Sequence, residues 1–261
     1  MSSAAALSAL RETLRAIEGD GLRRRPVLPF GIGPIDSRLA TGGLALGALH
    51  EIAAASPGMG DDAAATLFMA GLAARRCAQA GPGSVVLWAF ARRGLFAPGL
   101  AQAGLGPERL IHAEAGSDAA VLAVMEEGLR HGGLAAVIGE VEGAAMPATR
   151  RLQLAAEEGG VTALLLRRPK RAGRDPLSEP SAAATRWRLA CAPSVPLPEP
   201  VGDAGIGRAC WRLDLVRQRG GDGFSLTVEA ADAEGRLALP ARLRDRPDPA
   251  ARGGQDRLAA A

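Results

Sequence analysis

From residue 48 onward, short runs of apolar residues alternate with longer segments in which apolar residues recur every three or four positions. Uninterrupted apolar runs are typical of strands buried on both faces of a parallel sheet, and the longer spacing is typical of amphipathic helices. The predicted strands span 49–53, 85–90, 110–112, 134–139 and 161–166, and the predicted helices span 62–80, 117–131 and 147–158. This alternation predicts an α/β fold with a mainly parallel sheet flanked by helices.

The pattern changes after residue 166. Seven of the 18 prolines lie between Pro169 and Pro200, and further strand-like runs occur at 187–191, 211–216 and 224–230. A glycine-rich stretch, 220–223, separates the last two runs, which is typical of a hairpin with a longer loop. We therefore expect these runs to form antiparallel strands at one edge of the sheet.

The N-terminal residues predict a separate element. A short helix over 4–18 would carry a single apolar stripe formed by Leu7, Leu10, Leu14 and Ile17. Such a stripe can dock into a groove of a partner, or it can pack on the core of its own chain. We divide the chain into an N-terminal helical arm (1–20), an extended lead-in (21–47), a main domain (48–240) and a disordered tail (241–261).

Composition narrows the class of protein. The 261 residues are 48% hydrophobic and 23% charged, which allows a sizeable core and excludes a wholly disordered chain. No uncharged apolar run approaches the roughly 20 residues that span a bilayer, and no signal peptide is apparent, so we expect a cytoplasmic protein. The three cysteines are widely spaced, which favours reduced thiols over a disulfide framework or a zinc site.

The turn Gly42-Gly43-Leu44 and the strand and helix after it resemble the opening of RecA-type ATPase domains. The resemblance covers roughly residues 35–230 and implies a three-layer RecA-like fold. In that family a loop of the form G-x-x-x-x-G-K-[ST] binds phosphates through backbone amides, a lysine and a Mg²⁺-binding hydroxyl. Residues 55–62 occupy the corresponding place in this chain.

This loop departs from the ATPase pattern at its charged positions. Asp61 stands where the lysine belongs and Asp62 where the Ser or Thr belongs, and Ala55 replaces the first glycine. Two unit charges about 4 Å apart interact by ~4 kcal/mol at an effective dielectric constant of 20, so exchanging attraction for repulsion is a gross change of ~8 kcal/mol per phosphate charge. The alternative is that the two carboxylates hold Mg²⁺. We predict a degenerate nucleotide site formed by Gly58, Gly60, Asp61, Asp62 and Glu140.

The other ATPase features give a mixed picture. Glu140 ends an apolar run that resembles the strand whose acidic residue coordinates Mg²⁺, although a carboxylate that caps a turn would look the same. Residues 88–94 contain no carboxylate to activate water. His50, His112 and His131 are isolated, and we interpret His50 as a hydrogen-bonded strand histidine. We therefore predict no ATP hydrolysis, no catalytic residue, no cofactor and no metal.

A basic cluster follows the predicted strand 161–166. Five of the eight residues 167–174 are basic, and they include the chain's only lysine. In open α/β sheets, ligands bind beyond the carboxyl ends of the strands, and this position resembles the DNA-binding loop of RecA proteins. No aromatic residue lies within 167–186 to stack bases, so an acidic partner or simple solvation are alternatives. The candidate contacts with nucleic acid or a partner are Arg167, Arg168, Lys170, Arg171 and Arg174.

Taken together, the RecA-like core with a degenerate phosphate loop, the run 136–140 and the late strands 211–216 and 224–230 are similar to the ImuA family. That resemblance implies a non-catalytic accessory protein of DNA-damage-induced translesion synthesis. Its implied partners are an inactive Y-family polymerase relative and an error-prone replicative-type DNA polymerase. The sequence also leaves open binding of single-stranded DNA at the basic cluster and self-association of the chain, and it indicates no membrane partner. The alternatives are a SulA-like cell-division inhibitor and a RecA-type DNA-dependent ATPase.

Overall fold

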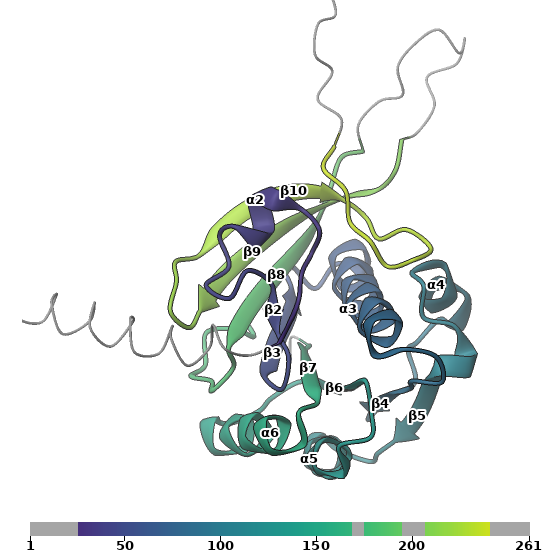
Figure 1. Cartoon of the computed structure of the whole chain (residues 1–261), viewed down its shortest axis with the longest axis vertical. Coiled ribbons are helices and arrows are strands. Elements are labelled where there is room, and N and C mark those ends of the chain that lie inside the picture. The colour runs from purple at the N-terminus through teal and green to yellow at the C-terminus, as the bar shows by residue number, and fades with distance from the viewer. Residues whose placement is uncertain (1–25, 169–174, 195–206, 241–261) are drawn as a thin grey trace, which may run out of the picture.

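The structure is a computed structural model that describes residues 26–168, 175–194 and 207–240 (Figure 1). Three sets of predicted features lie outside these residues. They are the apolar stripe of the N-terminal arm (Leu7, Leu10, Leu14, Ile17), the later part of the basic cluster (Lys170, Arg171, Arg174) and the tail 241–261.

An eight-stranded sheet forms the centre of the fold, in the order β10-β9-β8-β3-β7-β6-β4-β5. From β8 to β5 all neighbouring strands are parallel, whereas β9 and β10 are antiparallel additions. The strands are β3 (Leu49–Ala54), β4 (Val86–Phe90), β5 (Leu110–Glu114), β6 (Ala136–Val141), β7 (Thr162–Arg167), β8 (Thr185–Ala192), β9 (Cys210–Gln218) and β10 (Phe224–Glu229). This arrangement confirms the predicted fold class.

Helices cover both faces of the sheet, which gives three layers (Figure 1). The long helix α3 (Met59–Ala80) and the short helix α4 (Ala97–Gln102) lie on one face, and α5 (Asp118–His131) and α6 (Met146–Gly159) lie on the other. A short 3-10 turn (Pro107–Arg109) precedes β5. The hydroxyl of Ser117 accepts a hydrogen bond from the Ala120 amide (3.2 Å) and so caps the N-terminus of α5.

The lead-in differs from the extended segment that the sequence predicted. Within the described residues 26–47, β1 (Val27–Leu28) pairs antiparallel with β2 (Leu44–Ala45), and α2 (Gly33–Asp36) lies between them. Phe30 is buried, with its ring centroid 6.2 Å from that of Phe68 in α3 and 5.6 Å from that of Trp187 in β8. The lead-in therefore forms part of the core, because its apolar residues cover the sheet beside α3.

The sheet separates two apolar layers. The layer on the α3 side contains Trp187, Phe68 and Ile52, and the layer on the other side contains Met125 and Leu165. Because successive residues of a strand point to opposite faces, the parallel strands β3, β4, β6 and β7 each contribute buried apolar residues to both layers. Among the described residues, no helix is long and apolar enough to cross a membrane.

Candidate functional site at the carboxyl edge of the sheet

The candidate site is located where β3 ends and α3 begins. Gly58 is the N-cap of α3 and has an extended backbone, with φ −69° and ψ 143°. A side chain at Gly60 would begin 3.3 Å from the sulfur of Cys191, because the first turn of α3 lies against the end of β8. The loop that would hold phosphates in an ATPase is thus packed against a neighbouring strand.

Asp61, which stands where the ATPase pattern has its lysine, is held by two hydrogen bonds within the protein. Its Oδ1 accepts from the backbone amide of Cys191 (2.7 Å), and its Oδ2 accepts from the hydroxyl of Ser56 (2.6 Å). The same hydroxyl accepts from the Gly58 amide (3.2 Å). Asp61 therefore joins the loop and the start of α3 to the end of β8.

Asp62 and Glu140 share one cation, the guanidinium of Arg168. Arg168 donates from Nη1 to Asp62 and from Nη2 and Nε to Glu140 Oε2 (2.9 and 3.1 Å), and its Nη2 also lies 3.3 Å from the Thr66 hydroxyl. Trp88 donates from Nε1 to the other Glu140 oxygen (2.8 Å). Arg168 thus brings together Asp62 and Glu140, two acidic residues of the predicted degenerate nucleotide site. The sequence had indicated Arg168 as a contact with nucleic acid or a partner.

Burial and charge act on Arg168 in opposite directions. Burial alone would lower the pKa of this guanidinium, but the carboxylates of Glu140 and Asp62 more than offset this effect, so its pKa is raised. The Arg168 side chain is 23% exposed and that of Glu140 is 10% exposed. We call the three residues Asp62, Arg168 and Glu140 the Arg168 cluster, in which an internal cation neutralises the carboxylates.

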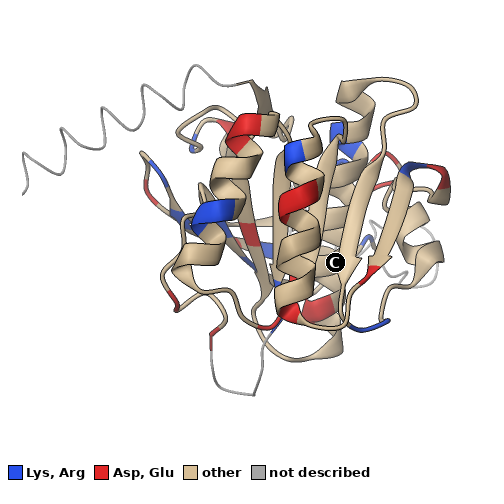
Figure 2. Cartoon of the chain, turned by 90° about the horizontal axis from the view of Figure 1, so that it is seen from below, with Lys and Arg blue, Asp and Glu red and all other residues tan. Residues whose placement is uncertain are grey.

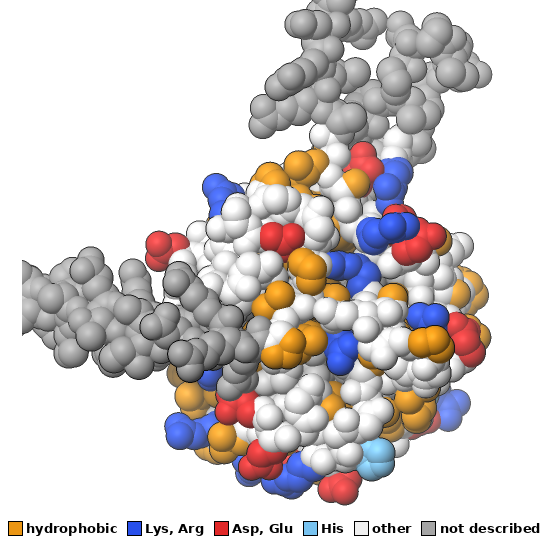
Figure 3. Space-filling view, viewed as in Figure 1, with side chains coloured by type: hydrophobic (Ala, Val, Ile, Leu, Met, Phe, Trp, Pro, Cys, Tyr) orange, Lys and Arg blue, Asp and Glu red, His pale blue; other side chains and the backbone are white. Residues whose placement is uncertain are grey.

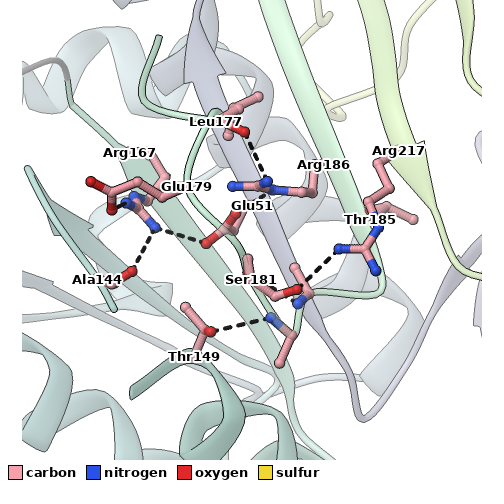
Figure 4. A network of polar contacts seen from close by, with 12 residues as sticks. Glu51, Ala144, Thr149, Arg167, Leu177, Glu179, Ser181, Thr185, Arg186 and Arg217 are labelled. Atoms are coloured by element: carbon pink, nitrogen blue, oxygen red, sulfur yellow. Dashed lines mark hydrogen bonds and ion pairs between the residues drawn. The ribbon is translucent and has the colours of Figure 1, made fainter. Parts of the chain in front are cut away.

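Arg167 requires a correction, because it does not lie on the binding surface that the sequence predicted. Its side chain is 1% exposed and forms ion pairs with Glu51 (2.9 Å) and Glu179 (3.3 Å). Arg186, directly opposite Glu51 in β8, donates to the second oxygen of that carboxylate (2.6 Å), as Figure 4 shows. We call Glu51, Arg167, Arg186 and Glu179 the Glu51 cluster. Arg167 lies inside the protein because the fully buried carboxylate of Glu51 needs cationic partners.

The segment that enters β8 is also held by side chains (Figure 4). Arg186 donates to the carbonyl of Leu177 (2.8 Å), Arg217 donates to that of Ser181 (3.1 Å), and the amide of Ala182 donates to the hydroxyl of Thr149 in α6 (3.2 Å). Arg188 pairs with Asp175, the first described residue after position 168. Both chain segments that flank residues 169–174 are therefore anchored.

His50 is a structural residue, as the sequence indicated. Its Nδ1 lies 2.7 Å from the hydroxyl of Thr185, and its Nε2 lies 2.8 Å from the carbonyl oxygen of Ala45. Burial lowers the pKa of its imidazole from 6.5 to about 4. Within the described ranges, no group of three or more His, Cys, Asp or Glu residues could hold a metal ion.

Charges of both signs are distributed over the described part of the chain. Figure 2 shows acidic and basic residues interspersed along helices and strands, and in Figure 3 small hydrophobic areas alternate with charged ones on the face drawn there. The exposed ion pairs Arg92–Glu142 (3.1 Å) and Arg93–Glu114 (2.7 Å) add to this mixture. In the described residues, acidic and basic side chains are therefore mixed and often paired, and they are not gathered into a surface region of one sign.

Comparison with known proteins identifies relatives of this chain. No protein-family model matches it. Two curated relatives, both called Protein ImuA and both from Caulobacter vibrioides (strains NA1000 and CB 15), are each 40% identical over 218 residues. The alignment covers 80% of this chain and 85% of each relative. The chain belongs to the ImuA family.

Proposed function

We propose that this protein is a non-catalytic accessory protein of DNA-damage-induced translesion synthesis. Its membership of the ImuA family, at 40% identity over 218 residues, is the observation that carries the proposal. Its partners would be the inactive Y-family polymerase relative and the error-prone replicative-type polymerase that the family resemblance implies. The protein would work in the cytoplasm and would require no cofactor.

The contacts at the carboxyl edge of the sheet support a non-catalytic role. A nucleoside triphosphate carries negative charge, and the phosphate loop presents Asp61 and Asp62 to it. Arg168, the cation that pairs with Asp62, also pairs with Glu140. Phosphates that entered here would meet acidic groups, and Arg168 could attract them only by leaving its partners. This argues against ATP binding and hydrolysis.

Two regions would make the contacts with other molecules. The arm 1–20 would dock into a groove of a polymerase-type partner through Leu7, Leu10, Leu14 and Ile17. The basic residues Lys170, Arg171 and Arg174 would contact the phosphates of single-stranded DNA. Arg167 is not part of this contact, because its guanidinium is buried in the Glu51 cluster.

Affinity purification of the full-length protein after DNA damage tests this proposal. We expect recovery of the two polymerase-type proteins, and loss of both when residues 1–18 are deleted. A variant with Leu154, an exposed leucine of α6, changed to Ala serves as the matched control and should retain both partners. Recovery of a tubulin-like division protein in their place would favour a SulA-like inhibitor and contradict the proposal.

A further inference from the structure

The strand β5 (Leu110–Glu114) is an open edge of the sheet. It is the last strand in the sheet order, and Figure 1 shows it at the end of the sheet. At the opposite edge, Glu229 of β10 donates its amide to the carbonyl of Ala238 (2.8 Å), so the chain after β10 folds back against that edge. β5 contains no lysine, arginine, proline or bulge, which are features that commonly keep edge strands apart. Within the described part of the chain, β5 is therefore the edge that is left free for strand pairing.

The backbone of β5 presents unused hydrogen-bonding groups at this edge. Ala115, just after β5, donates its amide to the carbonyl of Phe90 in β4 (2.8 Å), so the odd-numbered residues here bond to β4. The amides and carbonyls of His112 and Glu114 therefore point away from the sheet. The carbonyl of Leu110 does so too, whereas its amide donates to the preceding 3-10 turn. No described strand pairs with these groups, and such a row is a template for a further strand.

We propose that two copies of this protein associate through antiparallel pairing of their β5 strands, with the two His112 residues opposite each other. In this register, the amide of each His112 donates to the carbonyl of the other. The amide of each Glu114 donates to the carbonyl of the other copy's Leu110. A two-fold axis relates the copies, so one surface binds itself and the assembly closes as a dimer.

The side chains of β5 fit a second copy of the same strand. On the α5 face, Ile111 is 48% exposed and lines an apolar groove together with Leu87 and Val124. In the proposed register, Ile111 lies opposite Ala113 of the other copy. This pair occupies the position where antiparallel strands approach most closely, so a large side chain meets a small one there. Each Ile111 would cover the edge of the other copy without a clash.

The charges at the two ends of β5 also favour a second copy over a strongly charged partner. Glu114, at one end, pairs with Arg93 (2.7 Å), and Arg109, before the other end, lies 3.8 Å from Glu108. Antiparallel pairing brings the first of these ion pairs beside the second one of the other copy. Each end of the interface would therefore join two neutral pairs, whereas a strongly acidic or basic segment would gain no net attraction.

The short strand limits the strength of this dimer. β5 has 5 residues, and interfaces that bury less than about 1,200 Å² belong to weak or transient complexes. We therefore expect a dissociation constant in the micromolar range and a monomer at lower concentrations.

Disulfide trapping tests the register in full-length protein in which the exposed Cys191 is changed to Ala. His112→Cys should form a cross-linked dimer under mild oxidation, because the Cα atoms of such opposed residues are ~5.5 Å apart, within the range of a disulfide. Glu114→Cys should cross-link far more slowly, because the two copies of this position would lie ~14 Å apart. Cross-linking at position 112 that is no faster than at position 114 would overturn the proposed register.

Analytical ultracentrifugation of the full-length protein, from about 1 to about 200 µM, tests whether this edge carries the association. We expect the mass to rise from one copy toward two, and Ile111→Lys to weaken the dimer at least tenfold because it places a charge in the interface. Leu154→Lys is the matched control and should dimerise as the wild type does. Leu154 is also 48% exposed, but it belongs to α6, which packs mainly on α5, β3 and β7.

His112→Pro provides a second variant that acts on the backbone. It removes an amide that points away from the sheet, so the fold keeps its own strand pairing while the interface loses its central hydrogen bonds. We expect it to weaken the dimer at least tenfold as well. Three results would overturn the proposal: a wild type that stays monomeric at about 200 µM, a dimer that persists in both Ile111→Lys and His112→Pro, or growth beyond two copies, which indicates a head-to-tail contact.

Discussion

The Glu51 cluster and the Arg168 cluster have the same chemistry in two different environments. Each contains an arginine from the end of β7 paired with carboxylates of other elements, and the two arginines are adjacent in the chain. In the Glu51 cluster, Arg167 is 1% exposed and Glu51 is fully buried, whereas the Asp62 side chain of the Arg168 cluster is 41% exposed. The comparison indicates that burial, rather than residue type, decides which cluster maintains the fold and which can serve a surface function.

The largest loss of stability is expected when the charge of Glu51 is removed. Glu51→Gln would leave Arg167 and Arg186 buried without their shared carboxylate, and breaking a buried pair in this way costs about 3–5 kcal/mol of the free energy of unfolding. Urea denaturation measures the loss. Glu114→Gln, which weakens the exposed pair with Arg93, is the control. A loss below about 1 kcal/mol for Glu51→Gln would contradict the expectation that the Glu51 cluster contributes more to stability than the Arg168 cluster.

The next effect concerns pH and His50, the neighbour of Glu51 in β3. Its pKa is lowered to about 4 in the folded protein and is 6.5 in the unfolded chain, so the unfolded chain binds more protons between these values. Its contribution to stability is complete above pH 6.5 and declines as the pH falls toward 4, by ~3 kcal/mol in total.

Urea denaturation of the wild type and of His50→Gln at pH 7 and pH 4.5 measures this dependence. Other groups also titrate in this interval, so the quantity of interest is the difference between the two proteins. The wild type should lose more stability than the variant as the pH falls. Equal losses would mean that the imidazole is not held neutral in the core.

A smaller effect is expected from the Arg168 cluster. Arg168→Ala should lower the free energy of unfolding by about 1–2 kcal/mol, between the values for buried and for exposed ion pairs, because the cluster is partly open to water. Thermal unfolding monitored by circular dichroism provides the measurement. If the loss equals that of Glu51→Gln, the two clusters are energetically alike and the comparison fails.

The smallest effect is expected at the exposed pair of Arg93 and Glu114. Arg93→Ala should leave the melting temperature unchanged, because solvent screens this pair and both side chains are at least half exposed. The same thermal unfolding experiment measures it. A clear fall in melting temperature would show that exposure is not a sufficient guide to the importance of an ion pair in this fold.

Most of the sheet could be predicted from the sequence, because its parallel strands β3, β4, β6 and β7 are mainly apolar and the segments between most of them have the period of amphipathic helices. The strand 161–166, for example, is present as β7 (Thr162–Arg167). Helix α4 was missed because it has only six residues and contains Pro98 and Gly99, which leaves no helical period to detect. The lead-in was expected to be extended because of its prolines, but Phe30 and its apolar neighbours pack on α3 and β8.

The candidate site could be predicted only in part. The unusual loop with Asp61 and Asp62 is evident from the sequence, but its contact with Arg168, 106 positions after Asp62, depends on the order of the strands. The same holds for Arg167, whose partner Glu51 is 116 positions away. One signal in the sequence could have revealed the Glu51 cluster. Glu51 lies in a mainly apolar strand, β3, where its carboxylate needs a buried cation, and the neighbouring strands contain Arg167 and Arg186.

We infer that Arg168 and its acidic partners occupy the place where an ATPase binds nucleotide. Calorimetric titration of the full-length protein with a non-hydrolysable ATP analogue and Mg²⁺ tests it most directly. We predict no saturable heat of binding, because the analogue would meet Asp61 and Asp62 while Arg168 remains paired. Saturation at micromolar concentrations that is lost in Glu140→Ala would contradict the claim and favour a RecA-type ATPase.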